Sequence, residues 1–516
     1  MKDMMTLPWL TILAVTPLVG TAVVACLPRE RPGLAKKVAL GFAVLTLVVS
    51  LAMMTQYDLD GAGYQLTEKH DWIGIFGAYY SVGVNGIGLT LILLTTILVP
   101  IVMLASWPDA DEGSWSIHSF FAWFLFLEAL AIGVFAATDV LLFYVLFEAT
   151  LIPIYFLIGG YGAGRRSYAA VKFLIYNLVG GLVMLASVVG LYVVSSRDGK
   201  PSYLLTDLMN VPMGETTERW LFLGFLIAFA IKAPLWPLHT WLPDAAGSAT
   251  AGTSVLMVSV LDKIGTFGMI RFCLGLFPEA SQWASPVVMT LAIISIIYGA
   301  LLAIGQDDLR RLIAYTSVSH FGFIILGIFA FTSQSSTGAV LYMFNHGLST
   351  AGLFLVAGLM IRRRGSASIK DFGGVQKVAP VLAGVFLISG LSSLSLPGLA
   401  PFVSEFLVLV GTFSVSIPAA VIAALGIVLA SLYILLMYQR TMTGPLREDN
   451  RVVTDLDNRE IAAFAPVVVL IIGLGFFPQP LLNVIEPAVA ETLQHVDVND
   501  PGPQTPGPAT AEEGEQ

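Results

Sequence analysis

The feature that most constrains this chain is a succession of apolar runs, each about 20 residues long, which follow one another from the first residues almost to the last. A helical run of that length crosses the hydrocarbon core of a bilayer once. The sequence is 56% hydrophobic and 12% charged, whereas soluble domains carry about 25% charged residues. The pattern therefore excludes a soluble globular protein and predicts an all-α polytopic membrane protein.

Fourteen predicted transmembrane spans account for most of the chain. Their bounds are 7–27, 37–55, 82–106, 117–137, 139–160, 168–195, 219–239, 248–276, 285–305, 311–331, 337–361, 379–411, 417–439 and 461–484. The first span is too long for the core of a signal peptide and lacks a small-x-small cleavage site, so we expect it to be retained.

The distribution of basic residues predicts the orientation. The loops after spans 1, 5, 9, 11 and 13 hold 18 of the 26 lysines and arginines. Cytoplasmic loops carry the excess of basic residues, so we expect these loops in the cytoplasm of a bacterial cell and both termini outside. The net charge of −9 collects in loops and in the tail, and it does not indicate a nucleic-acid partner. Residues 485–516 end in an acidic, Pro-rich stretch, and we expect this tail to be disordered.

One stretch, AIKAPLWPLHTWLPDA at 230–245, places a lysine and two prolines inside an apolar span. A charged amine at the centre of a membrane helix costs roughly 2.5 to 3.5 kcal/mol, and a proline breaks the helix that carries it. Protein or trapped water must then satisfy the freed groups. We interpret the segment as an interrupted helix that holds Lys232 inside the bundle. The alternative, a kinked structural helix with a snorkelling lysine, fits less well because Lys232 lies far from the end of the run.

A second interrupted span carries Pro397, Pro401 and then Glu405. Paired interrupted helices in two halves of a chain are typical of inverted repeats around a transport site. If helices 4–8 and 9–13 form two five-helix repeats, helices 7 and 12 correspond. The predicted divisions are helices 1–3 at 1–116, a proton-translocating repeat at 117–276, a second repeat at 285–440, a loop and helix 14 at 441–484, and the tail at 485–516.

Glu148 is the candidate partner of Lys232 within the membrane. A neutral, structural glutamic acid is the alternative. An opposite charge within about 4 to 6 Å favours the charged form of each group, and burial opposes it. Such a pair holds or releases protons as its members approach or separate, which is what a proton relay needs. Asp139, at the outer end of the same span, is expected to be solvated.

Two more basic residues lie within span 8. Lys263 is predicted to be buried, with Ser259 one turn back as a possible hydroxyl contact. Asp262 is its neighbour in sequence, so it points to another face of the helix, and it receives no role. Arg271 lies near the outer end of the span, where it can snorkel.

Two histidines, His320 in span 10 and His346 in span 11, lie between the buried lysines and Glu405 in chain order. A lone histidine in an apolar helix is usually an ordinary core residue, but two in successive helices favour a hydrated relay, because histidine titrates near neutral pH. His239 is expected nearer the cytoplasmic surface. The predicted proton-translocation residues are Glu148, Lys232, Lys263, His320, His346 and Glu405.

No cofactor site is evident. Cys26 and Cys273 lie in separate spans, without the clustering that zinc or iron–sulfur sites show. The glycines at 159–164 follow no strand and are interpreted as a flexible turn. We therefore expect no cofactor in this chain and assign no catalytic or metal-binding residue.

Five stretches together resemble the antiporter-like subunits of respiratory complex I, over roughly spans 3 to 14. They are FYVLFEATLIPIYFLIGGYG, AIKAPLWPLHTWLPDA, LDKIGTFGMIRF, DLRRLIAYTSVSHFGFIILG and LPGLAPFVSEFLVLVG. The resemblance implies fourteen core helices with helices 7 and 12 broken, a glutamate on helix 5 (Glu148), lysines on helices 7 and 8 (Lys232 and Lys263), and a charged residue on helix 12. A glutamate there, Glu405, is typical of the M-type members. After WLPDA the chain departs from the family's usual His and APTAGS pattern.

The resemblance implies proton translocation driven by NADH oxidation and quinone reduction in other subunits. NAD, FMN, iron–sulfur clusters and quinone are expected in those partners, and the L-type and N-type antiporter-like chains and membrane lipid are expected neighbours. A subunit of a multi-chain cation/proton antiporter or of a membrane-bound hydrogenase is the alternative. A structural spacer gains nothing from buried charges. An independent solute transporter predicts activity of the isolated chain.

Overall fold

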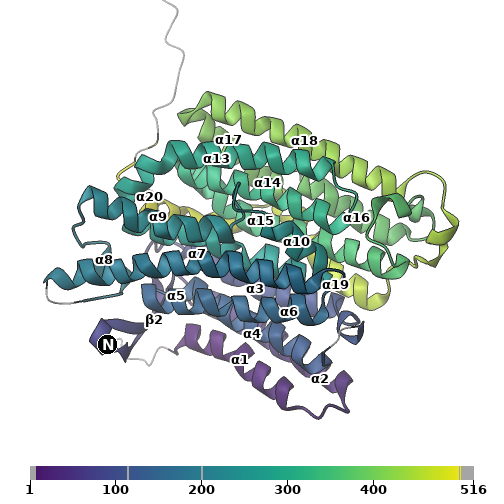
Figure 1. Cartoon of the computed structure of the whole chain (residues 1–516), viewed down its shortest axis with the longest axis horizontal. Helices are drawn as coiled ribbons and strands as arrows, with labels where there is room; N and C mark the ends of the chain where they lie inside the picture. The colour runs from purple at the N-terminus through teal and green to yellow at the C-terminus, as the bar shows by residue number, and fades with distance from the viewer. Residues whose placement is uncertain (1–6, 113–114, 199–200, 499, 501–516) are drawn as a thin grey trace, which may run out of the picture.

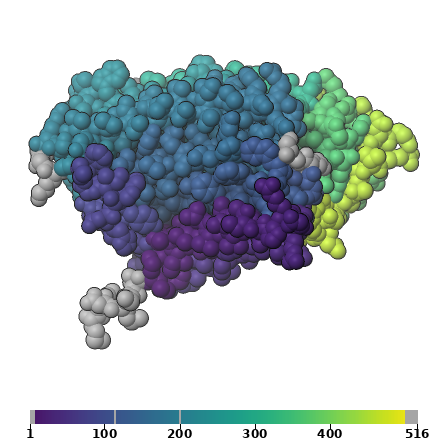
Figure 2. All heavy atoms as spheres, turned by 60° about the horizontal axis from the view of Figure 1, so that its bottom comes forward, coloured from purple at the N-terminus to yellow at the C-terminus, as the bar shows by residue number. Residues whose placement is uncertain are grey.

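The computed structural model describes residues 7–112, 115–198, 201–498 and 500. The helices run nearly parallel to one another, with α1 (Trp9–Cys26), α2 (Pro32–Met54) and α4 (Ile117–Ala136) along one edge and α18 (Ile417–Met442) along the opposite edge (Figure 1). Figure 2 shows the N-terminal helices in purple on one face, with the later helices in green and yellow at one end. Within continuous helices the backbone groups bond to one another, as a lipid environment requires.

Other helices fill the space between these edges. They are α3 (Gly86–Ala105), α5 (Val140–Ala149), α6 (Leu151–Tyr161), α7 (Arg166–Ser195), the short α8 (Leu205–Leu208), α9 (Glu215–Lys232), α10 (Trp241–Ser248), α11 (Ala251–Val255), α12 (Lys263–Gly268), α13 (Pro278–Ile304), α14 (Leu309–Phe329), α15 (Ser333–Arg364), α16 (Pro380–Ser393), α17 (Ala400–Val415), α19 (Asn458–Phe476) and α20 (Gln479–His495). Helix α15 lies at the centre, packed against α3, α14, α16, α17, α19 and α20.

Among the described residues, 12 helical segments are long and apolar enough to cross a membrane. They coincide with the predicted spans other than the two interrupted ones, 7 and 12. The predicted breaks are present: α9 ends at Lys232 and α10 begins at Trp241, while α16 ends at Ser393 and α17 begins at Ala400.

Side chains satisfy backbone groups at both interruptions. The indole N–H of Trp241 donates to the carbonyl of Ile231, 2.9 Å away. At the second break, the amide of Asn345 on α15 donates to the carbonyl of Ala400 at 2.7 Å. Such contacts are what allow a non-helical segment at membrane depth.

Two segments differ from the prediction. Gln65–Ile73 (β1) and Ala78–Val84 (β2) form an antiparallel hairpin, so span 3 begins at Gly86 and the chain is not wholly α-helical. The hairpin turns at Gly77, which has a φ of 64° that glycine adopts freely.

The predicted disordered tail is also wrong in its first part. Span 14 ends at Phe476, and α20 occupies Gln479–His495 because Pro478 disfavours the helical conformation of Phe477 and starts a new helix. The apolar side chains of α20 recur at helical spacing and are buried against α3 and α15. Residues 499 and 501–516 of the predicted tail lie outside the described residues.

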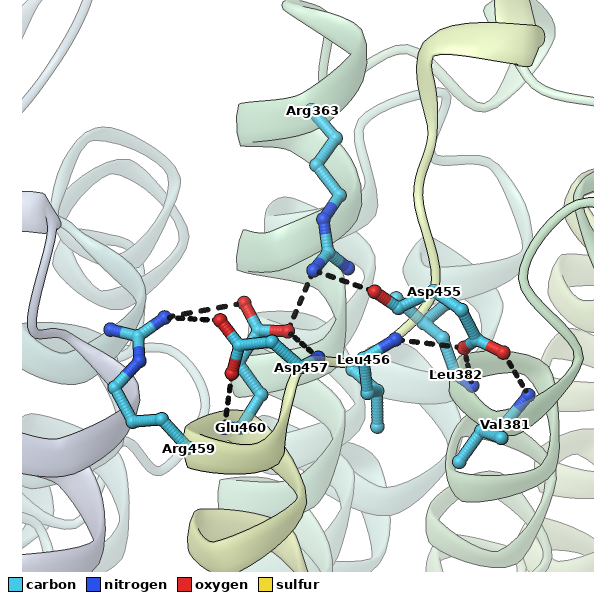
Figure 3. A network of polar contacts seen from close by, with 8 residues as sticks. All are labelled: Arg363, Val381, Leu382, Asp455, Leu456, Asp457, Arg459 and Glu460. Carbon is cyan, nitrogen blue, oxygen red and sulfur yellow. Dashed lines mark hydrogen bonds and ion pairs between the residues drawn. The ribbon is translucent and has the colours of Figure 1, made fainter.

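The loop before α19 joins three helix ends (Figure 3). The Asp455 carboxylate accepts hydrogen bonds from the backbone N–H of Val381 at 2.9 Å and of Leu382 at 2.8 Å, in the first turn of α16. Arg363, near the end of α15, donates to the carbonyl of Asp455 and forms an ion pair of 2.6 Å with Glu460 of α19. These contacts therefore link α16, the first half of broken helix 12, to α15 and α19 through the loop that carries Asp455.

We expect Asp455→Ala to destabilise the first turn of α16 by about 1 kcal/mol, because it removes a carboxylate from a helix N-terminus. Burial by itself raises the pKa of the Asp455 carboxyl, but hydrogen bonds from Val381 and Leu382 outweigh it and hold that pKa below its usual range. A lowered folded-state pKa stabilises the fold above the unfolded value of about 3.9, and the contribution is lost as pH falls through the folded pKa.

Hydrogen exchange of the α16 peptide and thermal unfolding of the detergent-purified protein measure the effect. The difference between variant and native protein should be constant near neutral pH and shrink as the pH is lowered below about 4. Asp449→Ala, which removes an exposed ion-pair partner of Arg364, is the matched control. Equal effects of the two substitutions would refute the capping role.

Candidate functional site

Lys232 is the last residue of α9 and is fully buried. Its ammonium group donates to the hydroxyl of Thr150 at 3.1 Å and lies 4.5 Å from the centre of the Phe147 ring. A hydroxyl and an aromatic face partly replace the water that a buried ammonium loses. The break after α9 thus places a cation against the junction between α5 and α6.

Glu148 lies between these two contacts in sequence and interacts electrostatically with Lys232. The predicted pair is therefore close, but the described side chains show no direct ion pair between them, and Oε1 of Glu148 is buried without a hydrogen-bond partner. The carboxylate packs against Gly181 of α7, where a Cβ would lie 1.6 Å from Oε1. Glycine at this place makes room for the carboxylate.

We expect Gly181→Ala to lower proton pumping at least about tenfold, because the added methyl group must displace the Glu148 carboxyl from its place beside Lys232. The measurement is NADH-driven acidification by membrane vesicles that contain the assembled complex. Gly159→Ala, whose Cβ meets only Ala170 at 3.7 Å, is the control and should pump normally. Normal pumping by the Gly181 variant would show that this placement does not matter.

Lys263 begins α12, and only Asp262 separates it from a π-helical segment, Leu256–Leu261. Its Nζ lies 2.6 Å from Nδ1 of His346 and 3.3 Å from the carbonyl of Val258. The wider π turn frees backbone carbonyls, a feature often found at functional sites. The predicted contact with Ser259 is wrong, because that hydroxyl donates to the carbonyl of Gly347 at 2.9 Å.

The two histidines lie side by side and are buried in the bundle. The ring centres of His320 and His346 are 5.2 Å apart, and His320 lies 5.9 Å from the ring of Tyr342. Nδ1 of His320 and Nε2 of His346 have no hydrogen-bond partner among the described residues. Each imidazole therefore has a nitrogen available to a bridging water.

Glu405 on α17 ends this series. It accepts a hydrogen bond from the Ser395 hydroxyl in the break of helix 12, and its Oε2 lies 3.5 Å from the hydroxyl of Tyr342. The hydroxyls of Ser393 and Tyr433 are buried, and neither has a hydrogen-bond partner in the part of the chain that the structure describes. The surroundings of Glu405 are polar enough to bind water.

The described structure thus arranges the six predicted residues, together with Tyr342, as a row inside the helix bundle. Its order is Glu148, Lys232, Lys263, His346, His320, Tyr342 and Glu405. Lys263 contacts His346 before His320, whereas chain order suggested the reverse.

Sequence reasoning missed two members of this environment. Tyr342 lies one helical turn before His346, and this i, i+4 spacing was the available signal. Thr150 carried no signal, since its role follows only from the packing of α9 on α5.

A further buried acid, Glu128 of α4, lies inside the apolar run FLFLEALAIG, and no lysine is among its electrostatic neighbours.

Asp139, expected to be solvated, and Arg271, expected to snorkel, are instead buried, and His239 is buried as well. Asp139 caps α5, accepting from the backbone N–H of Leu141 and Leu142. Arg271 does not snorkel, because it donates to the carbonyls of Phe135 and Ala137. His239 packs between aromatic rings and contacts no member of the row. Asp139 also accepts from the backbone N–H of Tyr79 at 2.9 Å, whereas Nδ1 of His239 and one guanidinium nitrogen of Arg271 have no hydrogen-bond partner among the described residues.

Known proteins share both the pattern and the fold. The family described as NADH:quinone oxidoreductase/Mrp antiporter, TM, matches residues 137–431. NADH-quinone oxidoreductase subunit M of Mycobacterium tuberculosis is 49% identical, with 98% of this chain and 97% of that protein covered. Subunit M of Rhodobacter capsulatus is 36% identical over 96% of this chain and 99% of that protein.

Two solved structures are similar over almost their whole length. A chain of respiratory complex I from Thermus thermophilus has a TM-score of 0.85 and 31% identity, covering 94% of this chain and 99% of its own. A chain of the Mrp complex from Dietzia sp. has a TM-score of 0.85 at 20% identity, covering 95% of this chain and 100% of its own, and shows the shared fold alone.

The fold and the intramembrane row define a membrane protein of the antiporter-like class. The chain belongs to the NADH:quinone oxidoreductase/Mrp antiporter membrane family. Within that family its full-length likeness is to subunits M of NADH-quinone oxidoreductases.

Proposed function

We propose that this chain translocates protons across the bacterial cell membrane as a subunit of an NADH–quinone oxidoreductase. NADH oxidation and quinone reduction take place in partner chains, which hold NAD, FMN, the iron–sulfur clusters and quinone. The observation that carries the proposal is the row of largely buried protonatable groups from Glu148 to Glu405, several of them in direct contact. Intramembrane charges are expensive, so a row of them indicates an ion pathway.

Each member of the row has a proposed part. Glu148 and Lys232 form a switch whose charges respond to the separation of α5 and α9. Lys263 passes its proton to His346 and His320, and Glu405 releases it to the outside. Water bridges the steps that are too long for direct hydrogen bonds. The two interrupted helices supply the mobile segments that prevent leakage.

The architecture follows the same proposal. We count fourteen transmembrane segments when the two interrupted spans join the twelve continuous ones, with both termini outside. The spans from α4 to α12 and from α13 to α18 form the two inverted five-helix repeats. The other antiporter-like chains and lipid are the neighbours, and the exposed apolar side chains of α7, among them Ile175 and Leu182, suit either contact.

Purification through a tag on this chain, followed by reconstitution into liposomes, tests the function. We expect a multi-chain complex that acidifies the liposome lumen when NADH and a quinone are supplied, with acidification abolished by a protonophore. Sodium/proton exchange without NADH would instead support the multi-chain antiporter alternative. Translocation by the isolated chain would support an independent transporter.

A further inference from the structure

Asp262 is a buried acid that the row described above leaves without a part. Its side chain is fully buried, and both carboxylate oxygens lack a hydrogen-bond partner among the described residues. Satisfied burial is the rule for polar groups, and an isolated carboxylate is among the most costly exceptions. Glu128 is buried in the same state, so the groups that surround Asp262 must carry the argument.

The helical face that carries Asp262 packs closely against the C-terminal end of α9. Gly265, three residues later, lies on the same face. A Cβ on Gly265 would lie 2.5 Å from the backbone nitrogen of Ala233 and 2.7 Å from the carbonyl of Phe229. Ala233 directly follows Lys232, so the close approach made possible by glycine brings Asp262 to the side of the bundle that holds this lysine.

Lys263 points away from that face. Successive residues of a helix are separated by about 100° around its axis. While Asp262 faces α9, the ammonium of Lys263 extends to His346 on α15. The Asp262 carboxylate interacts electrostatically with both Lys232 and Lys263. It therefore lies near both lysines of the row, which share no hydrogen bond with each other among the described residues.

We propose that the Asp262 carboxyl carries the proton between Lys232 and Lys263. The ammonium of Lys232 gives up one proton, through bridging water, to the Asp262 carboxylate, leaving a neutral amine and a neutral carboxylic acid. The acid then gives that proton to the neutral amine of Lys263, and the carboxylate is restored. One proton has moved, and no oxidant or reductant is needed.

A carboxyl suits this step for an electrostatic reason. Two ammonium groups facing each other in a low-dielectric interior repel, which hinders charging of the second before the first is discharged. An acid between them alternates between a negative and a neutral form, so the three groups need never carry two uncompensated positive charges. The inference rests on the proposed function and deepens it, because it assigns the link between the Glu148–Lys232 switch and the remainder of the row.

The test compares Asp262→Asn with Glu128→Gln in the assembled, reconstituted complex. Both substitutions replace a buried, unpartnered carboxylate with the amide of the same shape, but only Asp262 has lysines in electrostatic range. We expect Asp262→Asn to lower the NADH-driven pumping rate at least about tenfold, since a positioned proton carrier typically contributes 10²–10⁴-fold. Glu128→Gln should pump at the native rate.

Two further measurements separate a carrier from a structural residue. Asp262→Glu should recover most of the pumping, because it restores a protonatable group. Infrared difference spectra of complex with isotope-labelled aspartate should show a protonated-carboxyl band during turnover, absent from the Asp262→Asn complex. If Asp262→Asn does not assemble, the presence or absence of the protonated-carboxyl band in the native complex during turnover tests the inference.

Native pumping by Asp262→Asn, equal losses in the Asn and Glu variants, or absence of the carboxyl band during turnover would each overturn the inference. If Lys232→Ala remains defective in that case, the proposed function stands without Asp262. Failure of the native complex to pump while it oxidises NADH would overturn the proposed function itself.

Discussion

Glu148→Ala or Lys232→Ala should remove most proton pumping, at least about tenfold, and much of the coupled NADH–quinone activity, while the complex still assembles. Each residue sets how tightly the other holds its proton, so loss of either fixes the switch in one state. The hydrogen bond from Lys232 to Thr150 does not involve Glu148, so we expect it to persist in Glu148→Ala and the chain to fold. Acidification and NADH oxidation by reconstituted complex measure the two effects.

Glu148→Asp serves as the matched variant. It keeps the charge and shortens the reach toward Lys232, so it should retain part of the activity if charge matters more than reach. Thr150→Val, which removes only the hydroxyl that accepts from Lys232, should have a smaller effect than Lys232→Ala. Native pumping stoichiometry in a correctly assembled Glu148→Ala complex would refute the switch.

Glu405→Gln should block pumping, because Glu405 is the last protonatable group of the row and the amide cannot carry a proton. Its hydrogen-bond acceptor is preserved, so the contact with Ser395 and the local fold should persist. Moving one charge against the membrane potential costs roughly 2.3 kcal/mol per 100 mV, and an open path would leak. The Gln variant removes a proton carrier and keeps the contact with Ser395, so it should not open such a path. We therefore expect no increase in passive proton leak.

Glu405→Lys restores a protonatable group at the same place and should recover part of the pumping. Both variants are measured as NADH-driven acidification against the native complex, with passive leak followed after NADH is exhausted. Equal pumping by the Gln variant and the native protein would remove Glu405 from the pathway. A block in the Lys variant as complete as in the Gln variant would show that a protonatable group alone is insufficient there.

The parts of the fold that the sequence predicts well are those with an energetic cost in lipid. Lys232 followed by Pro234, and Pro397 followed by Pro401, mark helix breaks because neither a charge nor a missing backbone donor is tolerated without compensation. The structure has its two interruptions there. The same cost marks Lys263 and Glu405 as buried.

What the sequence predicts poorly depends on packing across helices. The hairpin β1–β2 and helix α20 lie mostly outside the predicted apolar spans, so hydropathy does not separate them from their neighbours, although the helical spacing of apolar residues marks α20. The place of Asp139 and Arg271 near span ends predicts exposure, whereas both are buried and bond to backbone groups of other segments, Asp139 to the N–H of Tyr79 and Arg271 to the carbonyl of Ala137. Likewise, the spatial order of His346 and His320 follows from the contact of α12 with α15, which chain order does not contain.

The most direct test of the central claim uses Lys263, the residue through which the row passes from the first half of the chain to the second. The measurement is the number of protons pumped per NADH oxidised by reconstituted Lys263→Ala complex, with assembly verified on a native gel. If protons pass along the row from Lys263 to His346, the variant should pump far fewer protons per NADH than the native complex. A native ratio in the fully assembled variant would contradict proton transfer through this chain.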